Sequence, residues 1–142
     1  MKLSKELLNN LISITSNSAI ACYPFIGKNE KILADKAATD IMRYELNKLD
    51  IKGKVVIGEG ELDEAPMLYI GEKLGNGSGP EIDIAVDPVE GTNFVAKNLP
   101  GAMTVLAISE KGNLFNAPET YMEKIVSGSH IPKDTLDLDY SL

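Results

Sequence analysis

The sequence predicts an α+β domain in which two N-terminal helices pack on one face of a mostly antiparallel sheet. Two observations predict it. Apolar residues recur at helical spacing through about the first fifty residues, and the later apolar runs are short and are bounded by glycine, proline or polar residues. Helices that come first in the chain, with strands after them, are typical of this class.

Two helices are expected. Ser4 offers an N-cap for the first helix, which should run to about Tyr23 because Pro24 and then Gly27 end it. The second helix is expected over about residues 32–49, where alanine, isoleucine, methionine and leucine recur at helical spacing.

The rest of the chain is expected to form strands. The expected strands cover residues 54–59, 67–71, 82–87 and 103–109, with a possible fifth at 124–127. The stretch Glu110-Lys111-Gly112-Asn113 between apolar runs predicts a hairpin turn. Asn76-Gly77-Ser78 matches the sequence pattern of a glycosylation site, but its glycine-rich surroundings favour a simple turn.

Composition restricts the classes of function. The chain has 142 residues, 44% hydrophobic and 25% charged, which suits one domain with its own core. The net charge of -7 argues against nucleic acid or an anionic membrane surface as a partner. No signal-peptide or membrane-spanning pattern is present, so we expect a cytoplasmic protein.

Two residue types that often carry chemistry are each present once. Cys22 is the only cysteine, which excludes an internal disulfide, and its apolar surroundings predict a small core residue. His130 is the only histidine and lies in a polar stretch without the partners of a catalytic triad, so we expect it on the surface.

The stretch Asp87-Pro88-Val89-Glu90-Gly91-Thr92 follows a short apolar run and carries two carboxylates three residues apart. Pro88 is expected to break the strand, Gly91 to turn the chain, and Thr92 to lie where a helix begins. Hard cations such as Mg²⁺ and Mn²⁺ take oxygen ligands of this kind. The stretch therefore predicts a metal site beside an anion site, with a solvated acidic turn as the alternative.

A second acidic corner lies upstream, in Gly58-Glu59-Gly60-Glu61-Leu62-Asp63-Glu64, again directly after an apolar run. Two such corners in one small domain favour metal binding over solvated turns.

These strings resemble a known family. Residues 87–92 are similar to the D-P-x-D/E-G-T signature of the lithium-sensitive, metal-dependent sugar phosphatases, which include inositol monophosphatases and fructose-1,6-bisphosphatases. Residues 56–73 and 116–124 resemble class II (GlpX-type) fructose-1,6-bisphosphatase nearly residue for residue. The resemblance implies the N-terminal half of the layered sugar phosphatase fold. It also implies metal-dependent hydrolysis of the 1-phosphate of fructose 1,6-bisphosphate to fructose 6-phosphate, in gluconeogenesis.

The resemblance also implies roles for individual residues. Two cations, Mn²⁺ or Mg²⁺, would be held by four carboxylates: Asp35 and Glu59 for the cation that activates water, Asp87 and Glu90 for the cation that bridges to phosphate. Asp63 and Thr92 would orient or deprotonate the water. Substrate would contact Lys31, Glu90, Gly91, Thr92 and Tyr121, and the Val89 carbonyl would be available to a metal.

Some of these residues have simpler readings. Asp35 near a helix start is commonly a partner of the helix dipole, and Asp63 and Thr92 suit a turn residue and an N-cap. Lys31 suits an exposed lysine at a helix start, and Tyr121 suits a core tyrosine.

The sequence departs from the family in two ways. Members are more than twice as long, so residues 1–142 are expected to be a metal-binding half without the C-terminal half. Asn93 stands where many relatives carry arginine, and Arg43 lies inside a helix pattern, so no arginine is expected beside the phosphate.

Two functions follow as alternatives: an enzyme that acts as a homo-oligomer or with the other half supplied separately, or a weak or inactive remnant that only binds divalent metal. Sedoheptulose bisphosphate and inositol phosphate stay open as substrates. A half-fold should expose an apolar face, so association is expected.

Overall fold

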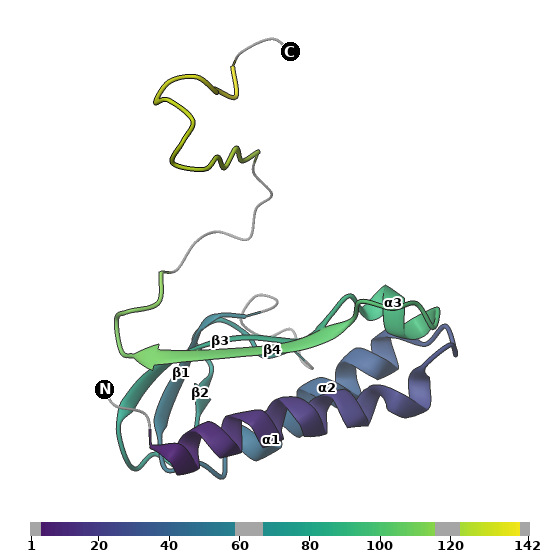
Figure 1. Ribbon diagram of the computed structural model, residues 1–142. Coiled ribbons are helices and arrows are strands. Elements are labelled where there is room, and N and C mark those ends of the chain that lie inside the picture. Colours follow the sequence, from purple (N-terminus) through teal and green to yellow (C-terminus); the bar gives the residue numbers. More distant parts are fainter. Residues whose placement is uncertain (1–3, 59–66, 116–122, 140–142) are drawn as a thin grey trace.

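The computed structural model describes residues 4–58, 67–115 and 123–139 (Figure 1). The helices are α1 (Lys5–Cys22), α2 (Lys31–Leu46) and α3 (Thr92–Ala96), with a 3-10 turn at Tyr23–Phe25. The strands are β1 (Lys52–Ile57), β2 (Lys73–Leu74), β3 (Glu81–Glu90) and β4 (Met103–Glu110). Residues 123–139 contain no helix or strand.

The two long helices form as predicted. The Ser4 hydroxyl caps α1 by accepting a hydrogen bond from the Leu7 N–H at 3.0 Å. The second helix ends at Leu46, three residues before the expected end. Beyond it the backbone continues in turns to Leu49, and the Asn47 side chain accepts a hydrogen bond from the Gly75 N–H at 3.1 Å.

The sheet has the strand order β2-β1-β3-β4. The β1–β2 and β3–β4 pairs are antiparallel and the central β1–β3 pair is parallel, so the sheet is mostly antiparallel as predicted. Both long helices lie on one side of it (Figure 1).

Three details of the strands were predicted wrongly. Residues 67–71 form turns, with Gly71 at φ 95°, and strand pairing starts only at Lys73. Residues 124–127 form no strand. Pro88 does not end β3, which runs to Glu90 with an irregular register against β4 between Asp87 and Glu90. Proline cannot donate to a ladder, and such a bulge accommodates it.

The turn predicted after β4 forms, because the Asn113 N–H donates to the Glu110 carbonyl at 3.1 Å. Asp83 of β3 accepts a hydrogen bond from the Gly112 N–H in this turn. Residues 116–122, where a second hairpin strand would follow, lie outside the described residues.

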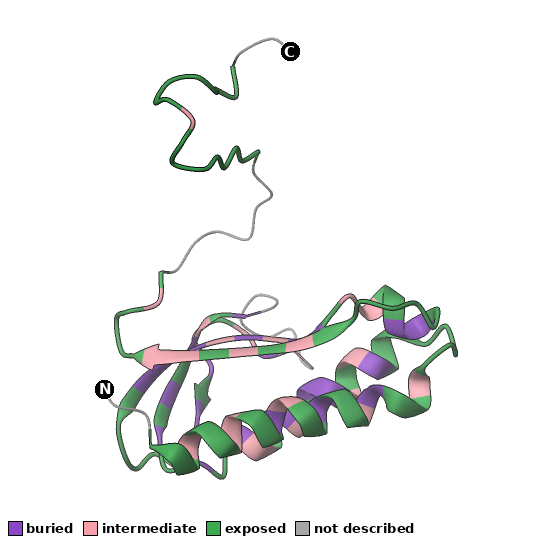
Figure 2. Ribbon diagram, in the orientation of Figure 1, coloured by how far each residue is buried: buried purple, intermediate pink, exposed green. Residues whose placement is uncertain are grey.

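The core has two parts, and Figure 2 shows its residues on the strands and on the inner sides of the long helices. The larger part lies between these helices and the sheet; its members include Ile14, Met42, Leu46, Val55, Ile82 and Ile84. The smaller part joins α1, α2, β3 and α3 through Cys22, Ala34, Ala38, Val89 and Val95. Its two alanines let α2 approach the end of β3, and this approach positions the candidate site.

Other expectations are confirmed. Cys22 is only 5% exposed, and His130 is exposed. The 75–79 segment is a turn in which Gly75, Gly77 and Gly79 all have positive φ, and in which Asn76 Oδ1 accepts from the Ser78 N–H at 2.9 Å. In the part of the chain that the structure describes, no helix is long and apolar enough to cross a membrane.

Candidate metal and phosphate site

Asp35 lies in the second turn of α2, directly after Ala34. Ala34 and Ala38 are fully buried in the smaller core part together with Val89, which lies two residues after Asp87 in β3. The close packing of α2 on this end of β3 therefore brings Asp35 to the end of the domain that carries Asp87.

The surroundings of the Asp35 carboxylate are unfavourable for its charged form. Its Oδ1 atom is buried and has no hydrogen-bond partner among the described residues. Burial raises the pKa of the Asp35 carboxyl above its ordinary value. A buried, unsatisfied carboxylate oxygen destabilises a fold unless a cation or a donor compensates it. This environment fits a metal ligand better than a surface partner of the helix dipole.

Residues 87–92 form the other side of the site. Asp87 is half-buried on β3, and Glu90 is the exposed last residue of that strand. Gly91 has φ 83°, and a Cβ atom there would lie 2.9 Å from the Phe94 ring. Glycine is needed at this position because the left-handed conformation and the close ring both disfavour a side chain. The chain thereby turns sharply from Glu90 into α3.

Thr92 is the first residue of α3, where the sequence predicted a helix start. The N-cap is Gly91, so Thr92 does not have the capping role that was its simpler reading. Its half-buried side chain remains available for another role. Lys31, the first residue of α2, is exposed, which suits both a substrate contact and a surface lysine.

Glu59, Asp63 and Tyr121 lie outside the described residues. The strand before Glu59 nevertheless shows where the chain leaves the sheet. Ile57 of β1 pairs in parallel with Ala85 of β3, two residues before Asp87. Parallel strands end at the same edge of a sheet, so the chain leaves β1 at the edge where the 87–92 corner begins.

Within residues 4–58, 67–115 and 123–139, no three acidic, histidine or cysteine side chains come together as a metal site. Asp35, Asp87 and Glu90 all belong to these residues, so the structure does not bring these three predicted ligands together as one group.

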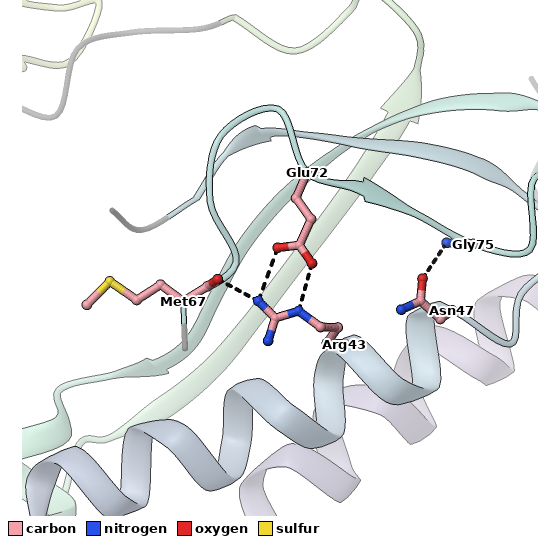
Figure 3. A network of polar contacts seen from close by, with 5 residues as sticks. All are labelled: Arg43, Asn47, Met67, Glu72 and Gly75. Carbon is pink, nitrogen blue, oxygen red and sulfur yellow. Dashed lines mark hydrogen bonds and ion pairs between the residues drawn. The ribbon is translucent and has the colours of Figure 1, made fainter. Parts of the chain in front are cut away.

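Arg43 has a partner that the sequence analysis missed (Figure 3). Its guanidinium binds both oxygens of the Glu72 carboxylate, at 2.7 and 3.1 Å, and it also donates to the Met67 carbonyl at 2.5 Å. Hydrogen bonding to Glu72 raises the pKa of Arg43 further. The expectation that this arginine does not clamp the phosphate agrees with these contacts. The sequence offered no local signal for this contact, because Glu72 and Met67 lie 29 and 24 residues further along the chain.

The chain is similar to known proteins over nearly its whole length. A family model described as bacterial fructose-1,6-bisphosphatase, glpX-encoded, matches residues 5–142. Fructose-1,6-bisphosphatase 1 class 2 of Escherichia coli (strain K12) is 49% identical over 138 residues, which cover 97% of this chain and 41% of that protein. The D-fructose 1,6-bisphosphatase class 2/sedoheptulose 1,7-bisphosphatase of Prochlorococcus marinus (strain AS9601) is 50% identical over 125 residues, or 88% of this chain and 38% of that protein.

The chain thus spans about two fifths of the length of these relatives. A solved structure described as an extragenic suppressor from Pyrococcus furiosus has a TM-score of 0.51 at 20% identity, over 75% of this chain and 41% of that one, and shares the fold. The family match over nearly the whole chain shows that it belongs to the glpX-encoded bacterial fructose-1,6-bisphosphatases.

Proposed function

We propose that this chain supplies the metal-binding part of a fructose-1,6-bisphosphatase active site. Asp35, Glu59, Asp87 and Glu90 would hold two divalent cations, Mn²⁺ or Mg²⁺. The observation that carries the proposal is the buried Asp35 oxygen without a hydrogen-bond partner among the described residues, at the end of the domain that carries the 87–92 corner.

The proposed reaction is hydrolysis of the 1-phosphate of fructose 1,6-bisphosphate to fructose 6-phosphate and phosphate. When bound, the cations lower the pKa of a water molecule and offset the charge of the phosphate. Asp35 and Asp87 come from a packed helix and a paired strand, so little reorganisation is needed to hold them in place. Thr92 and Asp63 would orient the water by hydrogen bonds.

The substrate side of the site is less complete. Gly91 turns the chain with a positive φ, and the backbone N–H groups of residues 90–92 would face the phosphate; the exposed Lys31 would supply a positive charge. Tyr121 would contact the sugar. Some relatives are named sedoheptulose 1,7-bisphosphatase as well, so sedoheptulose 1,7-bisphosphate is the second candidate substrate.

We further propose that turnover needs groups from a region equivalent to the rest of the longer relatives. Exposed apolar side chains are consistent with association, and those near the 87–92 corner are Phe94, Met103 and Val105. The partner that covers these exposed side chains would be a second copy of the chain or a polypeptide equivalent to that remaining region.

The test measures phosphate release from fructose 1,6-bisphosphate with Mn²⁺, for the chain alone and after addition of the remaining region of the Escherichia coli relative. We expect weak or no release alone and clear release from the mixture, abolished by Asp87→Asn. Mn²⁺ binding without release in either sample would favour a chain that only binds metal. No Mn²⁺ binding at all would contradict the proposed function.

A further inference from the structure

Lysine side chains gather on the face of the sheet that the long helices do not cover. Successive residues of a strand point to opposite faces. In β1, Val55 is buried in the core, so Lys52 and Lys54 lie on the opposite face, where both are exposed. In β2, Leu74 is buried in the same core and Lys73 is exposed. Both long helices lie on the core side (Figure 1), so three lysines from two neighbouring strands share the open face.

Two of these lysines are direct neighbours across the sheet. Lys54 of β1 pairs with Lys73 of β2 in the antiparallel register. Like charges at directly opposite positions destabilise a sheet. Among the described residues, Lys52, Lys54 and Lys73 take part in no ion pair. A negatively charged group bound between Lys54 and Lys73 would remove their repulsion.

A cavity of about 730 Å³ lies at this place on the sheet. Its lining includes the three lysines and Lys111, which follows β4. The half-buried side chains of Val56 and Leu114 add apolar surface to the same cavity. Pockets that hold small organic molecules commonly measure about 300–1,000 Å³. The volume and the mixed lining therefore suit a small molecule with a charged part and an apolar part.

Two carboxylates also line the cavity, and both already have partners. The two oxygens of Glu81 each accept a hydrogen bond from Lys111 Nζ at 3.1 Å. Asp83 is 4% exposed and accepts from the Gly112 N–H at 2.6 Å. Four lysines against these two carboxylates make the cavity locally positive, although the net charge of the whole chain is -7. A cleft of this sign concentrates anions.

The kind of positive charge favours phosphate over carboxylate. The described residues that line the cavity include lysines but no arginine. A planar carboxylate is matched best by the arginine fork, whereas lysine binds phosphate well as a point charge with three rotatable donors. We propose that this cavity binds a small phosphorylated organic molecule, whose phosphate lies between Lys54 and Lys73 and whose apolar part lies on Val56 and Leu114.

The proposed phosphate cavity is separate from the 87–92 corner. Glu81 is the first residue of β3, and Asp87 lies six residues further along the same strand. At about 3.3 Å per residue, this spacing corresponds to roughly 20 Å. The proposal therefore does not rest on the metal site, and it is tested in buffer that contains EDTA.

Inorganic pyrophosphate is the probe, and its binding to the whole chain is followed by calorimetry and by amide NMR. The test variant is Lys54→Gln with Lys73→Gln, which removes two charges from the cavity. The control is Lys36→Gln with Lys48→Gln, which removes the same charge from exposed ion pairs at 2.6 and 3.1 Å outside the cavity. Exposed pairs contribute little to stability, and the test variant removes a repulsion, so thermal unfolding should show both variants folded.

We expect pyrophosphate to shift the amide signals of Lys54, Lys73 and Gly112. The test variant should bind it at least about tenfold more weakly, because it loses charged hydrogen bonds to the phosphate. The control should stay within about twofold of the parent chain. Pyrophosphate should raise the melting temperature of the parent chain and of the control but not that of the test variant.

Several outcomes would overturn the proposed phosphate cavity. These are the absence of pyrophosphate binding, equal affinity of the test and control variants, and amide shifts confined to residues 87–92. A short polyglutamate peptide is titrated for comparison, and tighter binding of this peptide would show that the cavity takes an acidic polypeptide instead. The proposed function fails separately, because a chain that binds no Mn²⁺ would still bind pyrophosphate in EDTA.

Discussion

The Asp83 carboxylate accepts a hydrogen bond from the backbone N–H of Gly112 at 2.6 Å, and this bond ties the turn after β4 to the strand beside it. Asp83 is 4% exposed, and the same oxygen also lies 3.5 Å from the Leu114 N–H. A buried side chain of β3 thus holds the backbone of the turn that follows β4.

Replacement of Asp83 by alanine should destabilise the domain by about 1–3 kcal/mol, because it leaves the Gly112 N–H without its acceptor. Urea unfolding followed by circular dichroism measures the change. Glu81→Ala is the control: its exposed ion pair with Lys111 at 3.1 Å should contribute no more than about 1 kcal/mol. Equal losses for the two variants would contradict a special role for Asp83.

Replacement of Asp35 by asparagine should stabilise the metal-free protein at neutral pH. Burial raises the pKa of the Asp35 carboxyl, so between its ordinary value and the raised value the folded state binds more protons than the unfolded state. Stability contributed by this group therefore falls as the pH rises through that range. Thermal unfolding between pH 4 and 7.5 should show this fall in the parent chain and a smaller one in Asp35→Asn.

The same variant should no longer be stabilised by Mn²⁺ binding. A ligand at 100 times its Kd stabilises a folded protein by about 2.7 kcal/mol. Mn²⁺ should therefore raise the melting temperature of the parent chain and leave that of Asp35→Asn nearly unchanged. An equal rise in both would exclude Asp35 as a ligand.

The Cys22 thiol should react slowly with thiol reagents in the folded protein. Burial, and then the negative charge of Asp35, raise the pKa of this thiol to about 11. At pH 8.5 an ordinary cysteine is about half thiolate, whereas Cys22 would be less than about 1% thiolate. Labelling with a chromogenic disulfide in native buffer and in urea measures the difference. Rapid labelling of the native protein would show that this helix pair opens readily.

Replacement of Gly91 by alanine should destabilise the domain more than the same replacement at Gly112. Both glycines have φ near 84°, where a non-glycine residue costs about 1 kcal/mol or more. A Cβ at Gly91 would also lie 2.9 Å from Phe94, whereas nothing lies within 4 Å of one at Gly112. The difference between the two unfolding free energies therefore isolates the contact with Phe94, and no difference would mean that the ring moves aside freely.

Local features of this chain were predictable from the sequence, and features that depend on distant partners were not. The Ser4 cap, the burial of Cys22 and the helix start at Thr92 follow from neighbouring residues. The hydrogen bond between Asn47 and Gly75, by contrast, joins residues 28 positions apart.

The candidate site divides in the same way. The acidic corner at residues 87–92 could be recognised from its sequence motif. The burial of Asp35, in contrast, depends on how α2 packs against β3. The contacts of Arg43 with the Met67 carbonyl and the Glu72 carboxylate join residues 24 and 29 positions apart, so local sequence patterns could not reveal them.

The sheet order also determines when the domain can be completed during synthesis. Leu7 and Leu11 of α1 pack on the same core as Leu106 and Ile108 of β4, so the first helix meets a strand from near the other end of the domain. The central β1–β3 pair is parallel and cannot close through a short turn. Contacts between such distant segments form slowly. On the ribosome, the apolar faces of α1 and α2 therefore stay exposed until β4 has emerged. During this interval the nascent chain most needs protection from aggregation.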